Sequence, residues 1–175
     1  FGTRAVPGAI ERVWIDPVTW EPETEVLTDP EDSATLPVGL CGSGVIDAVA
    51  SLLESGIISA DGRFTLRPHR RLRRGAHGME YVLVWSHQSG LGEDLVVCAR
   101  DVRAVQLAVA AVRAGAAALL RRLGHCPADI ERVLVAGAFG SRLNVASAVR
   151  LGLLPPVHES RITFLGNAAG EGACL

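Results

Sequence analysis

Short runs of apolar and β-branched residues near the start of the chain have the pattern of β-strands. Residues 10–15 (IERVWI) and 24–28 (TEVLT) each mix such residues with polar ones over a few positions. Asp16 and Pro17 follow the first run directly, and both residue types favour a turn. The pattern therefore predicts a β-hairpin.

A helical spacing begins after the glycine-rich segment GLCGSG at residues 39–44. Apolar residues then recur every three or four positions, which is typical of a helix with one buried face: Val45, Ile46, Val49, Leu52, Leu53 and Ile57. We expect Ser43 to be the N-cap of this helix and Gly56 to mark its end.

The next segment, residues 58–79, loses this periodicity, and we expect an exposed insertion. It carries an arginine run, Arg67, Arg70, Arg71, Arg73 and Arg74. The run can either dock an acidic partner or remain solvated, and without interleaved aromatic residues we favour a solvated loop. Strands are expected at residues 81–85 and 94–99, joined by a turn at Gly90 and Gly92.

The longest apolar periodicity predicts a helix over residues 101–123. Asp101 stands at its start, where we interpret the carboxylate as a helix cap rather than a magnesium ligand. Beyond it, strand patterns at residues 132–137 and 161–166 alternate with a helical one at 145–150 and a short terminal helix from about Ala168. This succession predicts parallel βα units, and hence an α/β fold with a mixed sheet flanked by helices.

Composition narrows the chemistry. The 175 residues are 49% hydrophobic with a formal net charge of −2, which favours a folded core over an electrostatic attraction to nucleic acid. All basic residues other than histidine are arginines, so this chain has no phosphate lysine of a Walker A loop and no Schiff-base lysine. The most apolar stretch, residues 104–120, is interrupted by Gln106 and Arg113, and we expect no membrane span.

The cysteines are widely scattered, at Cys41, Cys98, Cys126 and Cys174. No pair has the two-residue spacing that zinc and iron–sulfur sites commonly use, and the histidines form no metal-binding motif. We expect reduced, mostly buried thiols in a cytoplasmic protein, with no metal site in this chain.

Three glycine-bearing segments are candidates for binding chemistry, because each joins a strand or loop to a helical pattern. Glycine there allows close backbone approach to a ligand, and the free amides of a helix start can hold an anion. The candidate residues are Gly137, Ala138, Phe139, Gly140 and Ser141 in VLVAGAFGSRLN, Gly166 and Asn167 in LGNAAGEGA, and Gly42, Ser43 and Gly44 in GLCGSG. The residues leave two alternatives open: convergence on one phosphate-rich ligand, or tight turns that bind nothing.

Four ordered blocks carry a resemblance to a known family: GLCGSGVIDAVASLLESGIISADGRF, ARDVRAVQLAVAAVRAG, IERVLVAGAFGSRLN and FLGNAAGEGA. Together with the opening RAVPGAIERV, they resemble the C-terminal actin-like (ASKHA) ATPase domain of the reductive activators of corrinoid-dependent methyltransferases. The resemblance implies a ribonuclease H-like α/β half-domain spanning residues 1–175. The first ATPase half and a ferredoxin-like domain with an iron–sulfur cluster are expected upstream.

The same resemblance implies use of ATP with Mg²⁺ to drive an electron onto inactive cobalt(II) corrinoid, giving cobalt(I). Gly137, Gly140 and Ser141 match the adenosine-side motif. The implied partner is a corrinoid protein or corrinoid-dependent methyltransferase, and a homodimer is a further expectation. Nucleic acid and membranes are not expected partners.

The chain departs from the family pattern at two places that bear on ATP binding. Cys98 and Ala99 stand where the family tends to carry Thr-Gln, and Val109 stands where a Lys is common. Two other functions stay open: a non-catalytic module of the same fold for partner docking or dimerisation, and a relative of the sugar and acid kinases.

Overall fold

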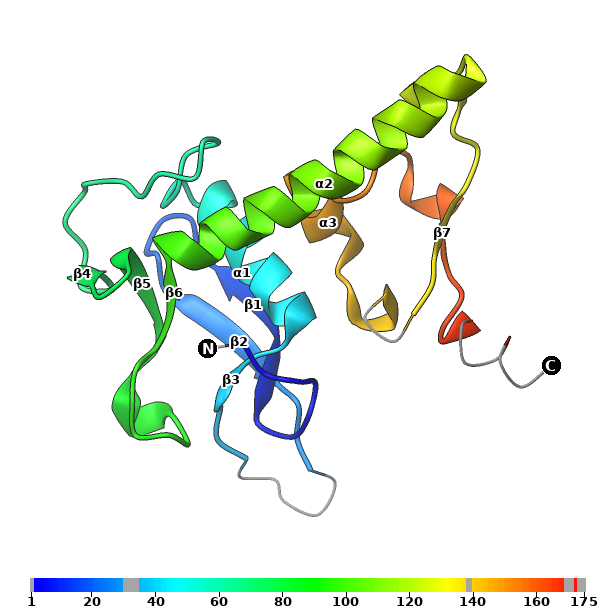
Figure 1. Ribbon diagram of the computed structural model, residues 1–175. Helices are drawn as coiled ribbons and strands as arrows, with labels where there is room; N and C mark the ends of the chain where they lie inside the picture. Colours follow the sequence, from blue (N-terminus) through cyan, green and yellow to red (C-terminus); the bar gives the residue numbers. More distant parts are fainter. Residues whose placement is uncertain (1, 30–34, 138–139, 169–171, 173–175) are drawn as a thin grey trace. The chain divides into compact units, whose positions relative to one another are not determined.

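The computed structural model describes residues 2–29, 35–137, 140–168 and 172. Figure 1 shows its strands and helices in chain order. The strands are β1 (Ala9–Ile15), β2 (Pro22–Val26), β3 (Gly39–Leu40), β4 (Leu72–Gly75), β5 (Gly78–Val84), β6 (Leu95–Cys98), β7 (Val133–Val135) and β8 (Ile162–Phe164). The helices are α1 (Gly42–Glu54), α2 (Ala99–Leu123) and α3 (Val145–Leu151). The expected α/β fold class is confirmed.

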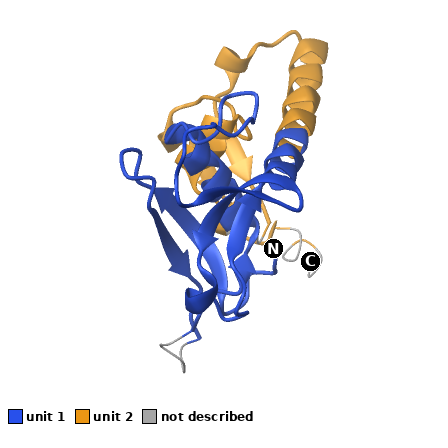
Figure 2. Cartoon of the chain, turned by 90° about the vertical axis from the view of Figure 1, so that its left-hand side faces the viewer, with its two compact units in different colours: residues 1–107 blue, residues 108–175 orange. Residues whose placement is uncertain are grey.

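The chain divides into two compact units, residues 1–107 and 108–175, which Figure 2 colours separately. In the first unit, β1 pairs with β2 in an antiparallel hairpin and with β3 in parallel. The predicted hairpin is thus confirmed, and mixed pairing occurs within this sheet. The short strand β3, inside the glycine-rich segment, was not predicted, because two residues are too few to show an alternating pattern.

Helix α1 packs along β1 and forms the core of the first unit with it. Ile10 of β1 and Leu52 of α1 are completely buried, and the Ser51 hydroxyl donates to the Val13 carbonyl oxygen at 3.0 Å. The predicted N-cap is wrong. The helix begins at Gly42, so Cys41 is the N-cap, and the buried Ser43 lies inside the first turn. Gly56 follows the helix in the left-handed conformation, as expected for its end.

The second sheet of this unit, β4-β5-β6, is antiparallel. The expected strands at residues 81–85 and 94–99 are confirmed as β5 and β6, in slightly different bounds. Most of the preceding segment is exposed, as predicted, but the expectation that its arginine run only solvates a loop is wrong. Residues 72–75 form β4, and Arg71, directly before it, is buried.

Arg71 is buried because every polar partner it needs lies around it. Its guanidinium binds the Glu21 carboxylate at 2.8 Å, donates to the Val82 carbonyl oxygen at 3.0 Å and lies over the Trp85 ring. Arg70 binds the other oxygen of Glu21 at 2.8 Å. A buried guanidinium is stable only when paired and hydrogen-bonded in this way. The arginine run therefore fastens the β1–β2 hairpin to the second sheet.

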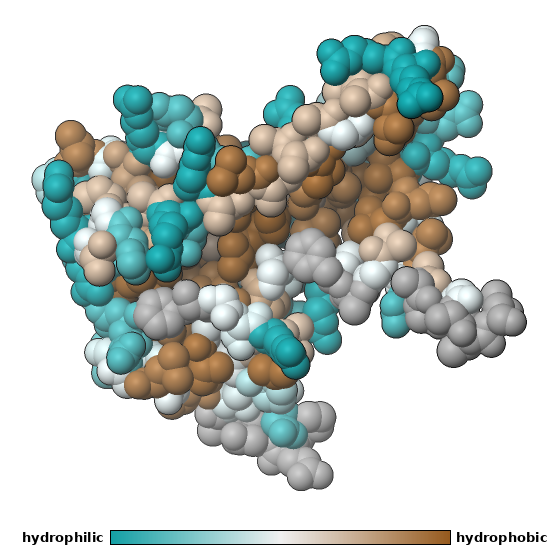
Figure 3. Space-filling view, viewed as in Figure 1, coloured by the Kyte–Doolittle hydropathy of each residue, from teal (hydrophilic) through white to brown (hydrophobic). Residues whose placement is uncertain are grey.

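Helix α2 confirms the predicted long helix and begins two residues earlier than expected. Its apolar stripe is buried in the first half, where Val102, Val105 and Val109 are at most 7% exposed. In the second half the same stripe is open: Val112, Leu119 and Leu123 are 50%, 64% and 69% exposed. Figure 3 shows apolar side chains on the surface along this part of the helix.

By length and composition alone, α2 could cross a membrane, although core helices can satisfy the same criterion. The apolar stripe of α2 has three to four residues per two turns, and arginines occur elsewhere on the helix. This pattern is typical of an amphipathic helix in a globular protein. The absence of a membrane span stays a prediction.

The second unit contains one parallel strand pair, β7 and β8, with Val133 opposite Ile162 and Val135 opposite Phe164. Both strands are shorter than the apolar runs that predicted them. Helix α3 lies between them in sequence and confirms the predicted helix. Asn144 caps it by accepting from the Ser147 amide at 3.2 Å, and Gly152 ends it with a φ of 77°. The terminal helix predicted from about Ala168 lies largely outside the described residues.

Candidate functional site

The ends of β7 and β8 bring two of the predicted glycine segments together. The Leu165 amide donates to the Val135 carbonyl oxygen at 2.9 Å, and the Gly137 amide donates to the Gly166 carbonyl oxygen at 2.6 Å. The two segments that follow β7 and β8 therefore stay side by side beyond the last paired residues of the strands. Parallel strands direct their carboxyl ends to the same edge, where ligands of open α/β folds bind.

The backbone at this edge requires glycine. Gly137 has a φ of +101° and Gly166 a φ of +65°, a backbone region that residues other than glycine rarely adopt. Among the described residues, no atom lies within 4 Å of a Cβ atom added at either position. The described part of the chain thus leaves the space beside both glycines open, and a ligand can approach their backbone closely. Asn167, the next residue after Gly166, is exposed.

Gly140 is glycine for a different reason. A Cβ atom there would lie 2.7 Å from Cγ1 of Val135, so this buried residue allows the turn after β7 to fold back against the strand. Its predicted contact with a ligand has no support in this packing and stays untested. Ala138 and Phe139 lie outside the described residues, and only the backbone of Ser141 is described.

The third predicted segment, Gly42, Ser43 and Gly44, forms the first turn of α1. A Cβ atom on Gly44 would lie 2.1 Å from the Ile10 carbonyl oxygen, so this glycine allows the helix to touch β1. The Ser43 hydroxyl faces the Cys41 thiol at 3.1 Å and is buried. Of the three residues, Gly42 is the exposed one. This segment belongs to the first unit, and its predicted convergence with the β7–β8 edge stays a prediction.

The first turns of the two long helices differ in their charge. The first turn of α1 contains no acidic residue, and Cys41 makes no side-chain cap, so its positive end is available to an anion. In α2, the Asp101 carboxylate accepts from the Cys98 amide and from the Cys98 thiol, each at 2.9 Å. The interpretation of Asp101 as a cap is confirmed. Its carboxylate, in the first turn of the helix, accepts from the backbone amide of the residue that precedes the helix.

Burial and the hydrogen bond to Asp101 both raise the pKa of the Cys98 thiol above its ordinary value. A thiol with a raised pKa stays protonated at neutral pH, and in this state it donates to the carboxylate. Val109, the other residue at a departure from the family pattern, is 7% exposed. Cys98 and Val109 are therefore buried side chains that pack within the fold, whereas Ala99 is partly exposed.

Comparison with known proteins assigns the family. A family model described as the C-terminal domain of RACo, the ASKHA domain, matches residues 1–175. The chain belongs to this family. It is 35% identical to the corrinoid activation enzyme RamQ of Eubacterium limosum over 183 aligned residues, which cover all of this chain and 30% of RamQ.

Two further relatives agree with this family. A Methanosarcina barkeri protein described as a Co(II) methylated amine-specific corrinoid protein reductase is 28% identical over 75% of the chain and 21% of its own length. Among solved structures, a reductive activator for a corrinoid, iron–sulfur protein matches 98% of the chain with a TM-score of 0.85 and 35% identity, over 27% of its own length. The chain thus spans less than a third of each relative.

One buried carboxylate in this ASKHA domain was not singled out from the sequence. Asp47 lies in α1, one turn after Gly44, and is 2% exposed. Its neighbours Ile46, Ala48 and Val49 in the helix are buried and apolar. Its place among these residues is the signal that could have found it, because carboxylates are rarely buried.

Proposed function

We propose that this chain is the C-terminal part of an ATP-using reductive activator that returns inactive cobalt(II) corrinoid protein to the cobalt(I) state. The family assignment and the corrinoid-related relatives support this proposal. The partner would be a corrinoid protein or a corrinoid-dependent methyltransferase. We propose a cytoplasmic location, no nucleic acid or membrane partner, and a homodimer as one form of assembly.

The observation that carries the nucleotide part of the proposal is the pair Gly137 and Gly166. Two positive-φ glycines joined by a hydrogen bond at the carboxyl edge of parallel strands, with open space beside both, fit a flat ligand that lies against the backbone. We propose that the adenosine of ATP is held here. Gly140 would act indirectly, by keeping the turn after β7 compact.

The start of α1, in the first unit, is a separate candidate for binding an anion. Its exposed Gly42 and its first turn without a carboxylate would receive phosphate oxygens, with charge supplied by the helix dipole. Bound ATP with Mg²⁺ would supply the free energy of hydrolysis that makes the uphill electron transfer possible.

We propose that the iron–sulfur cluster of the activator lies in another part of the parent protein. In the part of the chain that the structure describes, no group of three or more His, Cys, Asp or Glu residues could hold a metal ion. The role proposed for this chain is nucleotide binding, and the electron would be supplied through a different domain.

The open half of α2 supports the assignment of this chain to a larger ATPase. An apolar stripe exposed at Val112, Leu119 and Leu123 normally requires a cover. We propose that another part of the parent protein, including the first ATPase half, supplies this cover. A lipid bilayer fits the helix less well, because Arg113 in its middle would be costly in hydrocarbon.

The test is reactivation of the cognate corrinoid protein by the parent protein. With a low-potential reductant and Mg-ATP, each cobalt(II) should take one electron and give the visible absorption spectrum of cobalt(I). The 175 residues alone should neither reactivate nor hydrolyse ATP at a significant rate, because phosphoryl transfer needs groups from both halves of such a fold. Reactivation that proceeds equally without ATP, or ATP-dependent phosphorylation of a sugar or carboxylic acid, would contradict the proposal.

A further inference from the structure

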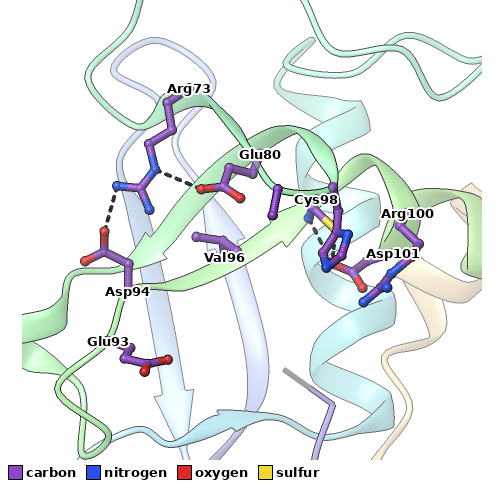
Figure 4. A pocket seen from close by; sticks show the side chains of 10 residues that line it. Arg73, Glu80, Glu93, Asp94, Val96, Cys98, Arg100 and Asp101 are labelled. Atoms are coloured by element: carbon purple, nitrogen blue, oxygen red, sulfur yellow. Dashed lines mark hydrogen bonds and ion pairs between the residues drawn. The ribbon is translucent and has the colours of Figure 1, made fainter.

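A cavity of about 530 Å³ lies in the first unit, beside the sheet β4-β5-β6 and the start of α2. Figure 4 shows its labelled side chains, which come from three strands, the loop before β6 and the first turn of α2. The volume is within the range of ligand pockets, about 300–1,000 Å³. Its wall is unlike that of most small-molecule pockets, since Ala76 and Val96 are its only purely apolar residues among those described.

Seven of the residues that line the cavity are ionisable side chains other than cysteine: Arg73, His77, Glu80, Glu93, Asp94, Arg100 and Asp101. Arg73 lies between two of the carboxylates and binds Glu80 at 2.8 Å and Asp94 at 2.7 Å. These bonds, drawn as dashed lines in Figure 4, raise the pKa of the Arg73 guanidinium. One positive and two negative charges leave this group with a net charge of −1.

The other carboxylates add to this negative charge. Among the described residues, Asp101 accepts from the uncharged amide and thiol of Cys98 and forms no ion pair, so no cationic side chain balances its charge. Glu93 and Arg100 form no ion pair within the described residues. Counting Asp101 and Glu93 as −1 each and Arg100 as +1, with His77 neutral, the cavity has a net charge of −2. Such a wall repels phosphates and attracts cations.

We propose that this cavity is the docking site for a positively charged side chain, Lys or Arg, on the surface of the corrinoid protein. The partner is the one given by the proposed function, on which this inference rests. The mainly charged wall and its negative balance favour a basic protein side chain over a nucleotide or an apolar small molecule. Arg73 holds Glu80 and Asp94 in place, and the unpaired Glu93 presents its charge to the incoming group.

Association rates of the parent protein with its cognate corrinoid protein test this proposal. Glu93→Gln removes one negative charge without changing the size of the side chain. Rim charges act mainly on the association rate and are screened by salt. We therefore expect this variant to associate several-fold more slowly at low ionic strength and at the wild-type rate in about 0.5 M salt, where the screening length is only a few ångströms.

Two matched variants make the test specific. Glu23→Gln removes an exposed carboxylate of the same unit that does not line the cavity, and its rate should stay within about twofold of wild type. Arg100→Gln removes a positive charge from the cavity and should accelerate association with a basic group. Unchanged thermal midpoints would establish that all three variants are folded.

The proposal is overturned if Glu93→Gln behaves like Glu23→Gln, or if Arg100→Gln slows association instead of accelerating it. The second result would indicate an acidic partner group. Failure of the proposed function gives a different result, because the wild-type parent protein would then neither bind nor reactivate the corrinoid protein at any ionic strength.

Discussion

The two units use glycine for opposite physical reasons. At the start of α1, in the first unit, a Cβ atom on Gly44 would lie 2.1 Å from a backbone oxygen of β1. At the β7–β8 edge, in the second unit, no atom of the described residues lies within 4 Å of a Cβ atom added at Gly137 or Gly166, and the backbone of both is left-handed. The first glycine is needed because the space is filled. The other two are needed by their conformation, and the space beside them is free.

This difference separates a packing glycine from one that is a candidate for ligand binding. All three occur in sequence segments of the same appearance, a glycine-rich run that joins a strand or loop to a helix. A ligand can approach only where the space is open. The β7–β8 edge is therefore the stronger candidate for close backbone contact, and at α1 only the exposed end of the helix is accessible.

The largest change in stability is expected for Gly44→Ala in the 175-residue chain. The added methyl group would collide with the backbone of β1, so α1 must move away from the strand that covers its buried face. We expect a loss of about 3 kcal/mol or more in the free energy of unfolding. Urea denaturation followed by circular dichroism would measure it.

Gly115→Ala is the matched control for this variant. Gly115 lies in α2 with no atom within 4 Å of an added Cβ atom. Alanine there should stabilise the chain by roughly 0.5–1 kcal/mol, because it favours the helix and meets no obstacle. If both variants changed stability equally, the contact between Gly44 and Ile10 would not be the reason for glycine in the first turn of α1.

A smaller change in the free energy of unfolding is expected when the carboxylate of Glu21, which joins the two sheets of the first unit, is neutralised. Burial tends to raise the pKa of Glu21, but hydrogen bonds and charges from Arg71 and Arg70 outweigh burial, and the pKa lies below its ordinary value of 4.5. The stabilisation that Glu21 contributes is therefore complete above pH 4.5 and is lost as the pH falls through the folded-state pKa.

Glu21→Gln should thus cost about 1 kcal/mol at pH 7, a modest value because the carboxylate is 36% exposed and screened by solvent. The difference from wild type should shrink as the pH is lowered below 4.5. Denaturation curves at several pH values would show this, with Glu23→Gln as a control, because the exposed Glu23 forms no ion pair with an arginine among the described residues. A difference that stays constant with pH would mean that the charge of Glu21 does not stabilise the fold.

Local patterns predicted most of the elements of this fold. The β1–β2 hairpin, α1, α2 and α3 all follow from spacing and turn residues, because each is decided by neighbours in sequence. The role of Arg71 could not be predicted in this way. Its partners Glu21 and Val82 lie far from it along the chain, and an arginine run without periodicity has the appearance of a solvated loop.

The candidate site was predictable to a similar degree. The sequence indicated the glycine segments. Because β7 and β8 pair in parallel, their carboxyl ends lie side by side, and this brings Gly137 and Gly166 together. The sequence does not show why glycine occurs at Gly44 and at Gly166. The two reasons differ in the distance from each glycine to neighbouring elements, and this distance is known only from the structure. The cap formed by Asp101 was predictable because it involves only residues of one turn.

The most direct test of the nucleotide site compares Gly166→Ala with Gly124→Ala in the parent protein by calorimetric titration with Mg-ATP. Both glycines have positive φ, +65° and +72°, and open space beside them, but Gly124 follows α2 and lies outside the predicted motifs. Each variant should therefore lose a similar amount of stability, about 1–2 kcal/mol, through backbone strain. We expect at least a tenfold weaker ATP affinity for Gly166→Ala and an unchanged affinity for Gly124→Ala. Equal affinities in the two folded variants would contradict it.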